Sequence, residues 1–294
     1  MAVTLALAGG AGCAGPAGVE PVGRDPEAQE GAGPAATSTS TSAAAVPPDP
    51  AAGGPGFGSQ AVPAPAWLGT RPLPLRPDGY GAIQPTPPEL QDRRLVTEDL
   101  LPPPSGDDFT ADVQAVPPAV AARSTWAPAC PVALDDLRYV TVAFWGFDGR
   151  PHTGELLVDA GAAEGVVEVF RRLHRARFPI EEMRITRTDE LDRHPTGDGN
   201  NTGAFVCRPS RGATSWSEHA YGRALDINPF HNPYVKGDVV LPELASAYTE
   251  RSHVRPGMIT AGDVVTGAFA DLGWAWGGTW RSSRDYMHFS ASGR

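Results

Sequence analysis

The chain has 294 residues, enough for one or two domains, and its formal net charge is −10. This acidic balance argues against a nucleic-acid partner, because phosphate binding requires a basic surface. No apolar run reaches the ~18 residues that a membrane-spanning helix needs. Of the 31 prolines, 22 lie at or before Pro128, whereas all 7 histidines follow residue 150. We therefore expect the chemistry in the second half of the chain.

Residues 1–13 have the pattern of an export signal. MAVTLALAGGAGC is a short apolar run that ends in small residues. Its ending, GGAGC, resembles the lipobox of bacterial lipoproteins, which predicts that Cys13 is acylated and anchors the protein to a membrane. No Lys or Arg precedes the run, and Gly10 stands where a lipobox usually has leucine. We expect an exported protein, either a cell-surface lipoprotein or a secreted one.

Two regions of unusual composition follow the leader. Residues 14–66 are rich in Ala, Gly, Pro, Ser and Thr, with no aromatic residue before Phe57. Such a segment cannot bury enough apolar surface to offset its ordering entropy, so it is predicted to be a disordered tether. Residues 67–128 contain aromatic residues and leucines but too many prolines for long helices. They are predicted to form an extended lead-in, parts of which pack against the following domain.

Residues 129–294 have the alternating strand and helix patterns of one compact α+β domain. LRYVTVAFWGF and HTGELLV predict two strands joined by a turn at Asp148-Gly149. The next segment predicts a helix whose apolar stripe recurs at i, i+3, i+4 and i+7. The stripe comprises Val166, Val169, Phe170 and Leu173. His174 lies among arginines on this helix and is expected to be solvated.

The rest of the domain predicts short strands and one more helix. FPIEEMRIT (178–186), RALDIN (223–228) and DYMHFS (285–290) are interpreted as strands, and AGDVVTGAFADLGW predicts a helix that ends at Gly273. Two cysteines, Cys130 and Cys207, also lie in this half. They form either a disulfide, if the protein is exported, or two buried free thiols.

Two short segments combine histidine with carboxylate. SEHAYGRALDIN (217–228) contains His219 and Asp226, and RDYMHF contains Asp285 three residues before His288. Hydrolytic zinc takes three ligands from His, Asp and Glu and keeps a fourth position for water, so three of these side chains suffice and Asp285 is left over. Side chains alternate along a strand, so Asp285 and His288 reach one site only if the chain bends between them or Asp285 lies in the preceding loop. The alternative is a set of ordinary turn and strand-end residues.

Together, SEHAYGRALDINP and WGGTWRSSRDYMHF resemble the D-alanyl-D-alanine carboxypeptidase (VanY-type) branch of the M15 zinc metallopeptidases. The family pattern S-x-H-x-x-G-x-A-x-D, followed near the C-terminus by D/E-x-x-H, is filled at every position. Small residues at Gly222 and Ala224 fit this pattern because they let other groups come close. The resemblance extends from about Cys130 to Phe289. It implies a small antiparallel sheet with flanking helices, as in the Hedgehog/DD-peptidase fold.

The resemblance also implies roles for individual residues. His219, Asp226 and His288 become ligands of a Zn²⁺ ion, and Asp285 becomes the catalytic base. Arg208, in FVCR, matches the arginine that steadies the substrate or the developing oxyanion, and Arg211 is the nearby alternative.

Two further residues are expected at the substrate. Ser217 matches the serine of the S-x-H motif, beside bound peptide, although a turn hydroxyl is the alternative. Within WAWGGTW, we interpret Trp274 as a core residue and Trp280 as a wall of the cleft.

The implied function is hydrolysis of peptidoglycan stem peptides, with the terminal D-Ala-D-Ala bond as the expected target. Two alternatives stay open: an endopeptidase that cuts within the stem peptide, such as at L-Ala-D-Glu, and a non-catalytic wall-binding module. A leftover carboxylate at Asp285 argues against the module, because a structural zinc site needs no carboxylate beyond its ligands. The protein is expected to be a monomer.

Overall fold

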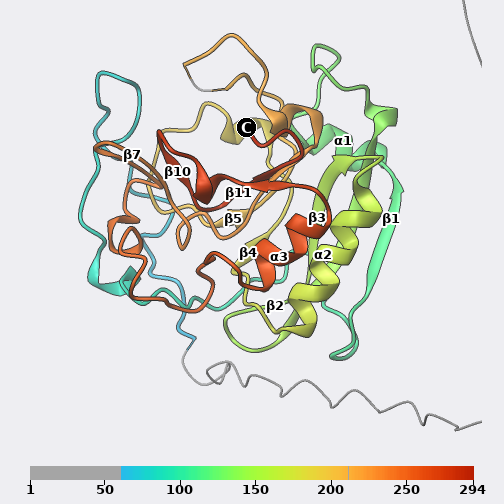
Figure 1. Ribbon diagram of the computed structural model, residues 1–294, viewed down its shortest axis with the longest axis horizontal. Coiled ribbons are helices and arrows are strands. Elements are labelled where there is room, and N and C mark those ends of the chain that lie inside the picture. The colour runs from blue at the N-terminus through green and yellow to red at the C-terminus, as the bar shows by residue number, and fades with distance from the viewer. Residues whose placement is uncertain (1–60, 211) are drawn as a thin grey trace, which may run out of the picture. The chain divides into compact units, whose positions relative to one another are not determined.

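The computed structural model describes residues 61–210 and 212–294, and every structural statement below concerns these residues (Figure 1). The predicted leader, the predicted acylation site at Cys13 and the predicted tether up to residue 60 lie outside them. Residues 61–66, which we assigned to the tether, are placed: Val62 pairs with Leu95 in an isolated parallel bridge. Within this part of the chain, no helix is long and apolar enough to cross a membrane.

The largest sheet is antiparallel and has the order β1-β2-β3. Its strands are β1 (Ala111–Ala115), β2 (Leu137–Trp145) and β3 (Pro151–Asp159). The β2–β3 pair is the hairpin that the sequence predicts, with the turn at Asp148-Gly149. Strand β1 comes from the proline-rich lead-in, which we predicted to be extended without assigning a strand to it.

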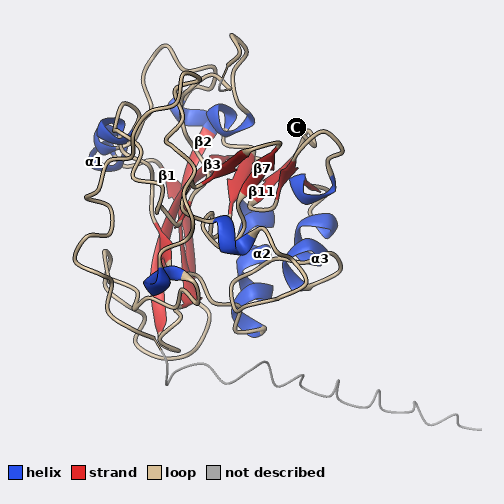
Figure 2. Cartoon of the chain, turned by 90° about the vertical axis from the view of Figure 1, so that its left-hand side faces the viewer, coloured by secondary structure: helices blue, strands red, loops and turns tan. Residues whose placement is uncertain are grey.

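Helices α2 (Ala163–Arg175) and α3 (Val264–Asp271) pack beside one another along the same side of this sheet (Figure 2). The four stripe residues of α2 are all buried in the main core with Phe269 of α3. Both predicted helices are confirmed. The expectation for His174 was wrong, because its ring is buried between Phe109 and Trp145. Phe109 belongs to the lead-in and covers this end of the helix.

Three smaller sheets complete the fold. One has the order β6-β11-β9, from Ala224–Asp226, His288–Ser290 and Ala275–Trp276. A second has the order β10-β7-β8, from Arg284–Asp285, Tyr234–Lys236 and Val239–Leu241. In the third, β4 (Glu182–Met183) pairs with β5 (Asn201–Thr202) in parallel. Helix α1 spans Pro118–Arg123, and short 3₁₀ helices cover Pro88–Leu90, Leu134–Asp136, Thr188–Glu190, Glu218–Tyr221, Ser246–Tyr248 and Gly277–Thr279. The α+β class with small antiparallel sheets and few helices is thus confirmed.

Two of the predicted strands differ from the structure. Segment 178–186 contributes only the two residues of β4, because Pro179 has no N–H and the N–H of Glu181 donates to the Asn228 side chain instead of to a neighbouring strand. Segment 285–290 is not one strand. It is divided into β10 and β11, which belong to different sheets.

The proline-rich lead-in packs into the same compact unit as the residues that follow it. Leu73, Leu90 and Leu95 are buried in a second core cluster with Phe230 and Tyr248. Parts of the lead-in thus pack against the residues that follow it, as the sequence predicts. Proline excludes long helices, but it does not prevent an extended chain from burying leucine side chains.

Cys130 and Cys207 form a disulfide. Of the two alternatives that the sequence left open, a disulfide or two free thiols, the structure has the disulfide. It ties the start of the 129–294 region to the segment just before the SEHAYGRALDIN motif, and both cysteines pack against a cluster of buried side chains that includes Leu137 and Phe205.

We expect removal of the disulfide by Cys130→Ala and Cys207→Ala together to lower the free energy of unfolding by about 4 kcal/mol, because the bond closes a long loop in the unfolded chain. Its partners are separated by 77 residues. Denaturant unfolding would measure the change. A reductant should shift the wild-type midpoint and leave that of the double variant in place. Equal midpoints for wild type and variant would contradict the prediction.

Candidate metal centre

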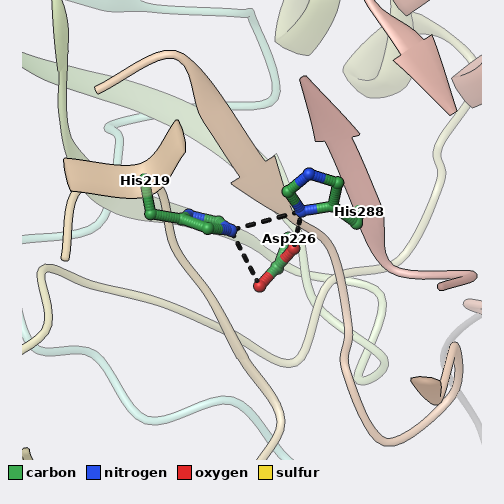
Figure 3. A group of neighbouring side chains, drawn as sticks. All are labelled: His219, Asp226 and His288. Carbon is green, nitrogen blue, oxygen red and sulfur yellow. Dashed lines mark hydrogen bonds and ion pairs between the residues drawn. The ribbon is translucent and has the colours of Figure 1, made fainter. Parts of the chain in front are cut away.

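The pairing of β6 with β11 brings two of the predicted ligands together. In this antiparallel pair, His288 lies directly opposite Asp226. Side chains at directly opposed positions share one face of the sheet, with Cβ atoms about 5 Å apart. The third predicted ligand, His219, comes from the 3₁₀ helix Glu218–Tyr221, which ends just before β6 begins (Figure 3).

Each imidazole directs one nitrogen outward to a backbone carbonyl. Nδ1 of His219 lies 2.5 Å from the carbonyl oxygen of Ala204, and Nε2 of His288 lies 3.1 Å from that of Arg294. A carbonyl oxygen can only accept, so both of these nitrogens donate. When the rings are neutral, the remaining nitrogens, Nε2 of His219 and Nδ1 of His288, therefore present lone pairs to each other and to Asp226. Outward hydrogen bonds of this kind fix the tautomer of metal-ligating histidines.

The distances among the three inner atoms suit a tetrahedral ion. Nε2 of His219 lies 3.3 Å from Nδ1 of His288 and 3.3 Å from Oδ2 of Asp226, and His288 Nδ1 lies 3.0 Å from Oδ1 of Asp226 (Figure 3). A tetrahedron with metal–ligand bonds of 2.0–2.1 Å has edges of about 3.3 Å. These three side chains are also the group in the described structure whose donor atoms could hold a metal ion.

The three donors also attract positive charge. Burial lowers the pKa of His288, but the hydrogen bond and charge of Asp226 outweigh it and raise this pKa to about 9. The half-buried carboxylate of Asp226 thus favours positive charge among the three donors, either a proton on His288 or a cation that replaces this proton. The donor set of two imidazoles and one carboxylate fits a metal ion that prefers nitrogen and oxygen ligands.

Asp285 reaches the same site because the chain changes sheets between β10 and β11. Asp285 pairs with Tyr234 of β7. Two residues later, the carbonyl of Met287 accepts a hydrogen bond from the N–H of Ile227, which directly follows β6 of the other sheet. The bend between Asp285 and His288, one of the two arrangements that the sequence allowed, lets both side chains line one cavity. Asp285 lies outside the three-ligand group, and its Oδ1 is buried without a hydrogen-bond partner.

The two carboxylates of the site have opposite pKa shifts. Burial opposes ionisation of Asp226, but the charge and hydrogen bonds of His219 and His288 hold its pKa well below the usual range. Burial raises the pKa of Asp285 to about 7, and the negative charge of Asp226 adds to the rise. Near neutral pH, Asp226 is therefore ionised while Asp285 can both accept and donate a proton.

Two glycines let the backbone approach closely at this site. Gly222 ends the 3₁₀ helix of His219 with φ +68°, and a Cβ there would lie 2.6 Å from the backbone nitrogen of Asp159. This explains why a small residue stands between His219 and Asp226. A Cβ on Gly277 would lie 2.7 Å from the carbonyl oxygen of Asp285. Both glycines therefore set the position of the site's side chains.

The site lies in a cavity of about 1010 Å³. Arg208, Ser217 and Trp280 all line it, while Trp274 is buried in the main core. The ring of Trp280 lies 5.5 Å from that of His288. Arg208 is exposed on the wall, and Arg211, the alternative, lies outside the described residues. These positions suit contacts with substrate, and the roles stay predictions.

Ser217 has a structural role that accounts for it without substrate. Its Oγ accepts a hydrogen bond from the N–H of His219 and so caps the 3₁₀ helix that carries this ligand. The turn-hydroxyl interpretation, which we kept as the alternative, is therefore found in the structure.

Several residues of the site could not be found from the sequence. The carbonyl of Ala204, which orients His219, is a backbone group and leaves no residue signal. Glu243 and Tyr80 also line the cavity, and neither belongs to a motif.

The structure thus defines an α+β protein in which a His–Asp–His group that could hold a metal ion lies beside Asp285, whose Oδ1 is buried. The family described as D-alanyl-D-alanine carboxypeptidase matches residues 211–291. The matched segment carries the site, and its similarity to this M15 peptidase family supports a hydrolytic peptidase that acts on peptidoglycan. Arg208 lies outside the matched residues. Comparisons with curated proteins and with solved structures found no match.

We expect one divalent transition-metal ion per chain and a loss of metal affinity of at least ~100-fold in His219→Ala, since removal of even an outer partner of a ligand costs 10–100-fold. Competition with a chelator would measure the affinity. His253→Ala removes an exposed histidine outside the cavity and should retain the metal. Equal metal affinity in the two variants would exclude His219 as a ligand.

We expect Gly277→Ala to reduce hydrolysis at least ~10-fold with little loss of metal, because the new Cβ displaces Asp285, and small misplacements of catalytic groups are costly. Gly267→Ala is the control, since its Cβ would meet only the far end of Arg172 at 3.7 Å. Helix propensity predicts a neutral or stabilising effect there. Wild-type rates in Gly277→Ala would show that this contact does not position Asp285.

Proposed function

We propose that the protein is a zinc-dependent carboxypeptidase that removes the terminal D-alanine from peptidoglycan stem peptides. The proposal rests on one observation: three metal-binding atoms converge beside the buried, unpartnered oxygen of Asp285. The surrounding cavity of about 1010 Å³ is large enough for a peptide. Export through the apolar leader would bring the enzyme to this substrate.

His219, Asp226 and His288 would hold the zinc, and their number leaves one coordination position open. Zinc bound there would supply Lewis-acid activation of water and polarisation of the scissile carbonyl. The backbone carbonyls behind the two histidines keep both rings in the orientation that the ion requires.

Asp285 would act as the general base and then as the general acid. Its Oδ1 has no protein partner and its pKa of about 7 lies near neutral pH. In the ionised form, Oδ1 accepts a proton from the attacking water; in the protonated form, it returns that proton to the leaving amine. Burial keeps bulk water from competing for this oxygen.

The cavity wall carries both carboxylates and guanidinium groups, and the guanidinium groups favour a substrate with a free C-terminus. Arg193, Arg208, Arg223 and Arg294 all line the wall. Guanidinium groups bind carboxylates in a bidentate manner, so one of them can hold the terminal carboxylate of a peptide, and Arg208 is our candidate. An endopeptidase has no terminal carboxylate next to the scissile bond, and we therefore favour the carboxypeptidase.

We expect Asp285→Asn to lower hydrolysis at least ~100-fold while zinc content stays near one per chain, because the amide keeps the shape of the side chain but cannot accept the proton. D-alanine release from a synthetic pentapeptide ending in D-Ala-D-Ala would measure the rate, and elemental analysis would measure the zinc.

The matched control is Asp238→Asn, which changes an 82% exposed carboxylate outside the cavity and should leave both quantities unchanged. Full activity in Asp285→Asn would refute the proposed base, and loss of zinc would make Asp285 a ligand. If the wild type releases peptide fragments instead of D-alanine, the enzyme is an endopeptidase.

A further inference from the structure

Glu243 is a buried carboxylate in the cavity wall without a positively charged partner. Its exposed fraction is 5%, yet it lines the same cavity as the metal site. Its Oε1 accepts a hydrogen bond of 2.8 Å from the backbone N–H of Gly81. Among the described residues, no Arg, Lys or His lies within ion-pair distance of it.

Two other glutamates of this wall do have such partners. Glu190 lies 2.8 Å from Arg184, and Glu218 lies 3.7 Å from Arg223. Removal of a carboxylate from water is costly unless a positive charge or several hydrogen bonds compensate for it. The protein supplies only one such hydrogen bond in the described structure, so a cation that enters the cavity would bind favourably at Glu243.

The register of the β10-β7-β8 sheet sets the distance between Asp285 and Leu241, which lies two residues before Glu243. Asp285 pairs with Tyr234, and Tyr234 pairs with Leu241, so these residues form one row across three strands. Strands lie about 4.8 Å apart, which places Leu241 about 10 Å from Asp285. Glu243 follows two residues later, and all four residues line the cavity.

A peptide bound for hydrolysis at the metal site can reach this distance. Three residues of extended chain span about 10 Å, and a long side chain can cover part of the same span. A group near Glu243 would therefore belong to a residue a few positions before the scissile bond, either to its side chain or to the peptide's N-terminus.

We propose that Glu243 binds a primary ammonium group of the substrate, and thereby selects peptides that carry a diamino acid or a free amino terminus near the scissile bond. This inference rests on the proposed peptidase function. A charge-assisted hydrogen bond to an otherwise unpaired buried carboxylate discriminates strongly against an uncharged analogue, because that analogue leaves the carboxylate unpaired.

Three peptides test the proposal and identify the source of the ammonium group. All end in D-Ala-D-Ala after a lysine: one is acetylated on the α-amine only, one on the side-chain amine only, and one on both. We expect kcat/KM of the wild type to be at least tenfold higher for one singly acetylated peptide than for the doubly acetylated one. Whichever peptide is preferred shows whether the side chain or the amino terminus carries the bound group.

The variant Glu243→Gln should reduce this preference to about onefold. Its amide oxygen can still accept from Gly81, so the wall keeps its shape while the charge is lost. Glu164→Gln, at an exposed position of α2 outside the cavity, should retain the wild-type preference. The proposal is overturned if the wild type shows no preference, whatever the variant does, or if Glu243→Gln retains it.

Calorimetric binding of the same peptides separates this inference from the proposed function. If the wild type releases no D-alanine from any peptide, the carboxypeptidase proposal fails. Tighter binding of an ammonium-bearing peptide, lost in Glu243→Gln, would then still support the role of Glu243, and equal binding or none would overturn it.

Discussion

The antiparallel register of β6 and β11 is the constraint on which the site depends. This register sets His288 opposite Asp226. The third candidate ligand, His219, lies in the 3₁₀ helix that precedes β6. A shift of the register by one residue would turn the side chain of His288 to the other face of the sheet, away from His219 and Asp226. Leu225 and Phe289 are also opposed in this register, and both are fully buried in the main core. The same shift would remove the side chain of Phe289 or Leu225 from the core, which makes it unfavourable. Core packing and ligand placement are thus fixed by the same pairing.

The bend before β11 creates the difference between the two carboxylates. Asp226 lies against two imidazoles, which stabilise its negative charge, whereas Asp285 enters from another sheet and finds no hydrogen-bond partner for Oδ1. Burial, together with the negative charge of Asp226, outweighs the opposing charge of His288 and raises the pKa of Asp285 to about 7. Two residues of the same type therefore acquire opposite pKa shifts from their surroundings alone.

The sequence predicts those parts of the molecule that local patterns encode. The β2–β3 hairpin and helices α2 and α3 follow from apolar periodicity, and the motif spacing singles out the three candidate ligands. The break between β10 and β11 could not be predicted, because a bend that joins two sheets depends on partners distant in the chain. The sequence predicts that parts of the proline-rich lead-in pack against the domain, but for a related reason it does not single out Leu73 and Leu95 as the buried residues. Proline predicts where helices cannot form, but not which extended segments find a core.

The matched residues and the lead-in contribute different parts of the cavity. The matched residues 211–291 contain the three donor atoms and Asp285, so they carry all four groups of the proposed mechanism. The lead-in contributes Tyr80 to the cavity wall and Gly81 to the hydrogen bond that holds Glu243, across a separation of 162 residues. A wall built from a segment outside the matched residues can vary without moving the three donor atoms. Selectivity for substrate would then reside where the lead-in meets the peptidase segment, and hydrolysis where β6 meets β11.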